Sequence, residues 1–120
     1  APSRIINLAA GEALEAGEAL KVHTDGTAKL ATSNLSPVIG FALTDTASGD
    51  TASIVTGSGI VINAITDAVT AGDELAVDSG KPGFLDTKTA YADGTEEDKI
   101  VAVALETNST TDSMTKVMVL

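Results

Sequence analysis

The sequence contains no cysteine and no tryptophan, and its only aromatic residues are Phe41, Phe84 and Tyr91. Without cysteine the chain has no disulfide framework, no thiolate metal site and no cysteine nucleophile. No apolar run approaches the 18 or so residues that a membrane-spanning helix needs, and no charged-then-apolar leader opens the sequence. The small first residue, Ala1, suggests that an initiator Met was removed.

Positive charge is also scarce, with 7 Lys and Arg against 17 Asp and Glu and a formal net charge of −10. Binding to nucleic acid requires clustered Lys and Arg, and no basic run occurs, so nucleic acid is not expected as a partner. An anionic membrane surface is disfavoured for the same reason. The excess of acidic residues is consistent with two interpretations. It either forms a surface that binds a basic partner or serves only to keep the protein soluble.

The chain consists of 120 residues, 43% of them hydrophobic, and these are mostly Ala, Val, Ile and Leu. This length and composition predict a single β domain spanning residues 1–120, with a modest core. Small aliphatic side chains fill little volume each. They therefore favour tightly paired strands, or an oligomer in which the subunits share a core.

An internal repeat organises the chain. Moving the stretch 15–23 by 55 positions (16 to 71) places it on the stretch 70–78, with Ala16 on Ala71 and Gly17 on Gly72. The match extends toward the N-terminus, where Ile5 falls on Ile60. Two copies of such a long period do not form a solenoid. They predict two similar β units that face each other in one small body.

Short apolar or alternating segments separated by turn residues fill the rest of the chain. Asp25-Gly26 is a strong hairpin signal. Residues 38–43 are apolar throughout and predict a buried strand, in which Gly40 allows close approach of a neighbour. Residues 114–120 alternate and predict a last strand. The pattern predicts an all-β fold, a small β-barrel or β-sandwich of about ten short strands with an internal two-fold pseudo-repeat.

The sequence contains few residues that could form a catalytic site. His23 is the only histidine, so a Ser-His-Asp site would have to use it, but it lies two residues before a turn and reads as a surface residue. Gly57-Ser58-Gly59 lacks the nucleophile-elbow pattern and the third glycine of a dinucleotide loop. It is predicted to be a hinge. No catalytic residue and no cofactor is expected.

Two acidic segments are candidate metal sites. Residues 45–50 have Ala47 and Gly49 where a calcium loop needs Asp or Asn. Four further acids lie close together and either gather a hard cation or form a solvated loop: Asp93, Glu96, Glu97 and Asp98. We expect the solvated loop and no metal site. A carboxylate pair for sugar hydrolysis remains open, although the aromatic platforms typical of sugar sites are missing.

The motifs of the chain together resemble those of a known family. They are an apolar N-terminal segment, an Ile-Gly-x-Ala-Leu strand followed by a polar turn at 39–43, an Ala-Gly-Asp-x-Leu-x-Val-Asp turn and strand at 71–78, and a counterpart of the 39–43 strand at 101–105. Over nearly its full length the chain resembles the small capsid cement, or head-decoration, proteins of tailed bacteriophages. It departs from the commonest pattern by a long loop at 87–98.

This resemblance implies a non-enzymatic β protein, usually a homotrimer, that is made in the host cytoplasm and sits on the outer surface of the virion. Its partner would be the major capsid protein, whose neighbouring subunits it would clamp. A β-sandwich binding module of a fibre or adhesin is the alternative. A small hydrolase using His23 and the acids is a third hypothesis.

The N-terminal segment is predicted to be an extended arm that docks on the capsid or on a neighbouring subunit. Two large apolar residues stand a few positions from the chain end, where disorder is the default unless something holds the chain. The only arginine precedes them and suits a carboxylate contact. The alternative is a first strand of the protein's own sheet. The proposed capsid-binding residues are Ala1, Pro2, Ser3, Arg4, Ile5, Ile6 and Asn7.

Overall fold

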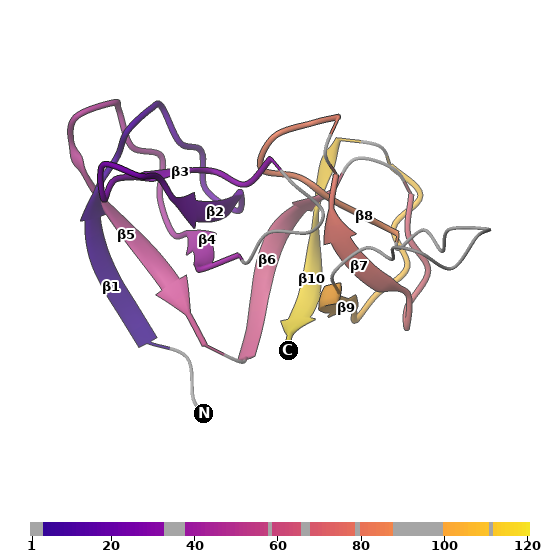
Figure 1. Cartoon of the computed structure of the whole chain (residues 1–120). Helices are drawn as coiled ribbons and strands as arrows, with labels where there is room; N and C mark the ends of the chain where they lie inside the picture. The colour runs from indigo at the N-terminus through magenta and orange to yellow at the C-terminus, as the bar shows by residue number, and fades with distance from the viewer. Residues whose placement is uncertain are drawn as a thin grey trace, which may run out of the picture.

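The computed structural model in Figure 1 describes residues 4–32, 38–57, 59–65, 68–78, 80–87, 100–110 and 112–120, and for residues 60–65 the backbone alone. These residues form ten strands and no helix. In the part of the chain described, no helix is therefore long and apolar enough to cross a membrane. The predicted all-β class with about ten short strands is confirmed.

The strands are three to seven residues long, as the closely spaced turn residues predict. In chain order they are β1 Arg4–Ala9, β2 Ala19–Val22, β3 Ala28–Leu30, β4 Gly40–Ala42, β5 Thr51–Thr56, β6 Gly59–Ile65, β7 Glu74–Val77, β8 Leu85–Thr87, β9 Ile100–Ala104 and β10 Ser113–Val119.

The two halves of the chain have the same topology, which confirms the pseudo-repeat. The first five strands form a sheet in the order β1-β5-β4-β2-β3, and the last five form a closed barrel in the order β10-β6-β8-β7-β9. A parallel pair, Ile65 with Leu85, closes the barrel, and the first repeat has an isolated parallel bridge, Ala10 with Ala28, at the same place. The second repeat is thus a closed barrel. The first repeat has the same strand order, but its sheet is less completely closed.

Hydrogen bonds between loops repeat as well. Leu14 and Thr46 exchange two backbone hydrogen bonds of 2.8 Å, and Val69 and Asn108 exchange two of 2.9 Å at the equivalent place. The turns before β2 and β7 each contain a glycine of the aligned pair, with φ of 89° at Gly17 and 95° at Gly72. Such angles favour glycine because a Cβ clashes there. The loop and turn predicted for both copies are therefore present.

Figure 1 shows the repeats side by side, joined by the turn from β5 into β6. The start of β1 and the end of β10 lie at the same end of the molecule as this turn, because Arg4 pairs with Thr56 and Val119 pairs with Gly59. We call this the hinge end. The Gly57-Ser58-Gly59 segment thus connects the two repeats, and Ser58 lies outside the described residues.

The buried side chains form two clusters. One belongs to the first repeat and centres on Leu14, Leu20 and Ile54. The other joins Ala19, Ala31 and Phe41 of the first repeat to seven residues of the second: Val69, Leu75, Val77, Leu85, Ala102, Ala104 and Val117. Because this second cluster contains side chains from both repeats, the burial of apolar surface holds the two repeats together.

The predicted buried strand at 38–43 is wrong at its ends. Only Gly40–Ala42 are in β4, Val38 and Ile39 are half-buried, and Leu43 is 46% exposed. The cause is the pleat, which turns Leu43 away from the core on which Ala42 is buried. The close approach expected at Gly40 is confirmed, because a Cβ there would overlap the carbonyl oxygen of Val55 on β5.

Candidate functional site

The N-terminal segment is the first candidate surface. The structure describes it from Arg4 onward, and residues 1–3 lie outside the described part. Arg4–Ala9 form β1, an edge strand paired with β5, as in the strand alternative. Arg4, Ile5 and Asn7 are nevertheless exposed, and Ile5 is 58% exposed. The segment therefore offers an outward face from within a sheet, and its contact with a capsid stays a prediction.

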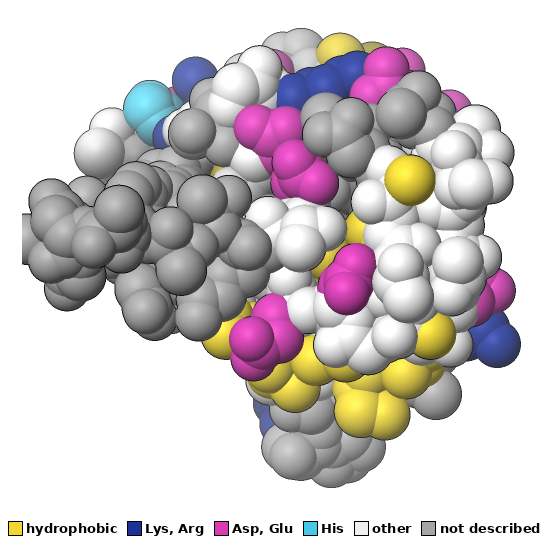
Figure 2. Space-filling model, turned by 90° about the vertical axis from the view of Figure 1, so that its right-hand side faces the viewer, with side chains coloured by type: hydrophobic (Ala, Val, Ile, Leu, Met, Phe, Trp, Pro, Cys, Tyr) yellow, Lys and Arg dark blue, Asp and Glu magenta, His cyan; other side chains and the backbone are white. Residues whose placement is uncertain are grey.

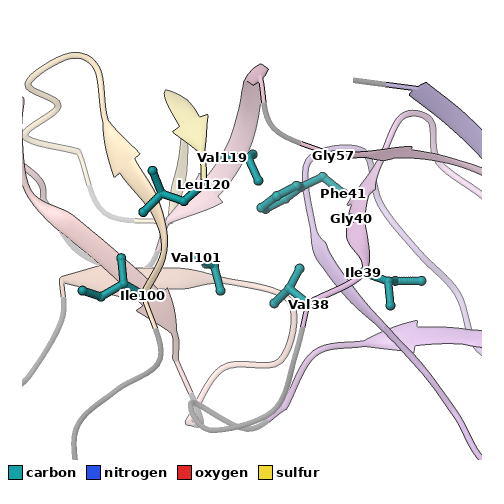
Figure 3. A pocket seen from close by; sticks show the side chains of 9 residues that line it. All are labelled: Val38, Ile39, Gly40, Phe41, Gly57, Ile100, Val101, Val119 and Leu120. Atoms are coloured by element: carbon teal, nitrogen blue, oxygen red, sulfur yellow. The ribbon is translucent and has the colours of Figure 1, made fainter. Parts of the chain in front are cut away.

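A pocket of about 320 Å³ lies between the two repeats near the hinge end. Figure 3 shows Phe41 and Val119 pointing toward one another across it, while Val38 and Val101 face each other from the two repeats. The residues that line it are Val38, Ile39, Gly40, Phe41, Gly57, Ile100, Val101, Val119 and Leu120. We call it the junction pocket.

The lining residues come from equivalent positions of the two repeats. Val101 stands 62 positions after Ile39 (39 to 101), and Val119 stands 62 positions after Gly57. The same displacement relates β4 to β9. Ala42 donates a backbone hydrogen bond to Glu18, directly before β2, and Ala104 donates one to Asp73, directly before β7. The two repeats therefore contact each other through equivalent surfaces, and the pocket lies at this contact.

The side chains that line the junction pocket are apolar. None of the nine lining residues that the structure describes has a polar side-chain atom, so the polar atoms that they contribute belong to the backbone. These nine side chains supply no general acid, general base, nucleophile or metal ligand, and the pocket suits an apolar side chain or a peptide backbone.

The outer face of β10 adds two large apolar side chains. Thr115 and Val117 are buried, whereas Met114, Lys116 and Met118 are exposed, which confirms the predicted alternation of the last strand and places one cation between the two methionines. Leu120, at the rim of the pocket, is 64% exposed. Figure 2 shows hydrophobic side chains gathered along the lower part of one face, with acidic side chains spread over the rest of it.

Among the residues that the structure describes, the candidate catalytic and metal-binding side chains are not brought together. His23 lies at the β2–β3 turn, where its backbone bonds with Thr27 and Gly26. In the described ranges its side chain has no hydrogen bond to a serine or an aspartate. Asp45 instead accepts a hydrogen bond of 2.8 Å from the backbone of Ala16, so it stabilises a turn.

Within the same ranges, no three His, Asp or Glu side chains gather as a metal site requires. The acidic segment with Asp93, Glu96, Glu97 and Asp98 lies outside the described residues.

Sequence reasoning did not find the junction pocket. The available signal was a pair of apolar residues at equivalent places of the two repeats. Val38-Ile39 lie directly before β4, and Ile100-Val101 are the first two residues of β9. This signal did not show that these two pairs face each other, because this depends on how the repeats pack.

The fold belongs to the class of duplicated five-stranded β units that pack side by side. No protein-family model matches the sequence, and no curated protein matches it. The chain is similar to a solved structure described as the head fiber gp8.5 N base in bacteriophage phi29, with a TM-score of 0.73 and 14% sequence identity. The match covers 99% of this chain and 95% of that chain, so the two share the whole fold.

Proposed function

We propose that this chain is a structural protein of a bacteriophage virion that binds the outside of the mature head. In this function it contacts the major capsid protein, clamps neighbouring capsid subunits and has no enzymatic activity. The observation that carries the proposal is the full-length match, in both directions, to the base of a phage head fibre. The resemblance of the sequence motifs to cement proteins points the same way.

The physical character of the surface supports binding over chemistry. The junction pocket presents apolar side chains, and the outer face of β10 presents Met114 and Met118 on either side of Lys116. A protein that binds only the expanded shell stabilises that state by mass action. Many copies on one particle multiply a modest contact energy.

We place the capsid contact at the hinge end. β1 begins there at Arg4, Ile5 is exposed, and the junction pocket opens near the same turn. The proposal keeps the N-terminal segment as the contact but assigns it a different geometry. Arg4–Asn7 would bind through the outward face of β1 and not as a detached arm.

A second candidate function is a binding module at the base of a fibre. The description of the similar structure as a head fibre base favours it. The two candidate functions predict different polypeptides in the virion. Peptide mapping of purified virions by mass spectrometry would find this sequence alone for a cement protein, and joined to a fibre sequence for a fibre base.

Co-sedimentation with heads of the cognate phage tests the main proposal. We expect the protein to bind expanded heads and not unexpanded procapsids. A Leu120→Asp variant should bind more weakly, whereas Met114→Asp, on the same face of β10 but at its other end, should bind as the wild type does. No binding to either particle by the folded wild-type protein would overturn the proposal.

A further inference from the structure

Glu18 is a buried charged residue at the boundary between the repeats. Its side chain is 8% exposed, and its Oε1 accepts a hydrogen bond of 2.7 Å from the backbone of Glu15. This bond closes the turn that leads into β2. Burial of a carboxylate is costly unless a cation compensates it. Glu18 forms no ion pair within the described ranges.

The second repeat shows that turn closure does not require a glutamate. At the equivalent position Asp73 accepts a hydrogen bond of 2.9 Å from the backbone of Thr70, and Asp73 is only half-buried. The longer side chain of Glu18 instead reaches the other repeat. A Cβ placed on Gly83 would lie 3.1 Å from the Glu18 Cβ and 3.2 Å from its Oε2.

Gly83 connects the two repeats through its backbone. Its carbonyl oxygen accepts a hydrogen bond of 2.7 Å from Ala19, and its N–H donates one of 2.9 Å to Ala31. Ala19 directly follows Glu18 and belongs, like Ala31, to the core cluster shared by the repeats. The Glu18 carboxyl group is thus packed against the segment that holds the repeats together.

The charges around Glu18 all act in one direction. Burial raises the pKa of Glu18 above its ordinary value of 4.5, and the carboxylates of Glu15, Glu12 and Asp45 raise it further, while the hydrogen bond from Glu15 lowers it. From the second repeat, Gly83 brings no side chain. Lys81 of the same turn is paired with Asp112 and lies over the Phe84 ring.

We propose that Glu18 makes the junction between the two repeats sensitive to protonation. The neutral acid packs against Gly83 without a desolvated charge, whereas the carboxylate favours an opening that lets water reach it. Because the folded-state pKa is raised, this contribution to stability is fully present below about pH 4.5 and is lost as pH rises through the raised value. The inference stands independently of the proposed function.

Amide hydrogen exchange of the full-length protein, followed by NMR and expressed as protection factors, tests the proposal. In the wild type the protection of the Ala19 and Gly83 amides should fall as pH rises above about 4.5 and through the raised pKa of Glu18. Glu18→Gln should keep protection high over this range. Asp73→Asn, in the equivalent turn, should behave as the wild type does.

A further variant keeps the test decisive if Glu18→Gln does not fold. Glu15→Gln retains the backbone donor to Glu18 and removes one of the neighbouring charges, so the midpoint of the loss of protection should move to lower pH. An unchanged pH dependence in Glu18→Gln, or an unchanged midpoint in Glu15→Gln, would overturn the proposal. So would loss of the pH dependence in Asp73→Asn.

Discussion

Replacing Gly40 by Ala should destabilise the protein strongly, because the new methyl group has no space. A Cβ at Gly40 would overlap the carbonyl oxygen of Val55 and lie 2.8 Å from a methyl carbon of Ile54. Phe41, next to Gly40, pairs with Val55, so this oxygen belongs to the strand that holds β4 in the sheet. The overlap therefore forces the two strands apart and is not relieved by a side-chain rotation.

Overpacking of a tight core costs about 1–3 kcal/mol, and a backbone obstacle places Gly40→Ala at the upper end. A loss of about 3 kcal/mol is a large part of the roughly 5–15 kcal/mol that stabilises a typical domain. At about 4 °C per kcal/mol, the midpoint of thermal unfolding should fall by roughly 12 °C.

Urea unfolding followed by circular dichroism measures this change as a lower midpoint with an unchanged slope. Gly80→Ala is the matched control, because a Cβ there would meet only a carboxylate oxygen of Asp78, at 3.3 Å. We expect the control to lie within about 0.5 kcal/mol of the wild type. A Gly40→Ala protein as stable as the control would refute the argument from close approach.

Three further predictions concern binding and assembly. Deletion of Ala1–Arg4 should leave a folded protein that binds heads much more weakly. Full binding in co-sedimentation would remove this segment from the contact, and loss of folding would show that its main role is in β1. His23→Ala, and Ala at Asp93, Glu96, Glu97 and Asp98, should change stability by about 0.5 kcal/mol or less and leave head binding intact; loss of a bound metal together with binding would contradict this. Light scattering should find a homotrimer, at least on the particle, because a core of small side chains leaves one subunit little apolar volume to bury; a monomer both free and bound would exclude it.

Local features of the fold could be predicted from the sequence because they depend on neighbouring residues. The Asp25-Gly26 turn, the alternation that ends in β10 and the paired glycines Gly17 and Gly72 each have a local signal. The displacement of 55 positions holds for β1 with β6 and for β2 with β7. The displacement is 62 positions for β4 with β9, the strand that contains Ala104. A search with one constant displacement therefore does not find the equivalent residues in the later strands.

Long-range features could not be predicted in this way. Closure of the barrel depends on one pair between distant segments, Ile65 with Leu85. The junction pocket depends on the packing of one repeat against the other. The exposure of Leu43 and Leu105 was hidden because a run of apolar residues lacks the alternation that marks the outward face.

The differences between the repeats explain why two similar units form one body. Phe41 is 2% exposed and belongs to the core cluster of the second repeat, whereas Val103, at the equivalent position of β9, is half-buried and outside that cluster. Glu18 likewise reaches Gly83 of the second repeat, whereas the shorter Asp73 accepts a hydrogen bond from Thr70 within its own turn. Each of these larger side chains is on the first repeat and is packed at the junction. The first repeat thus supplies side chains that complete the core of the second, and this asymmetry fixes a single arrangement of the two units.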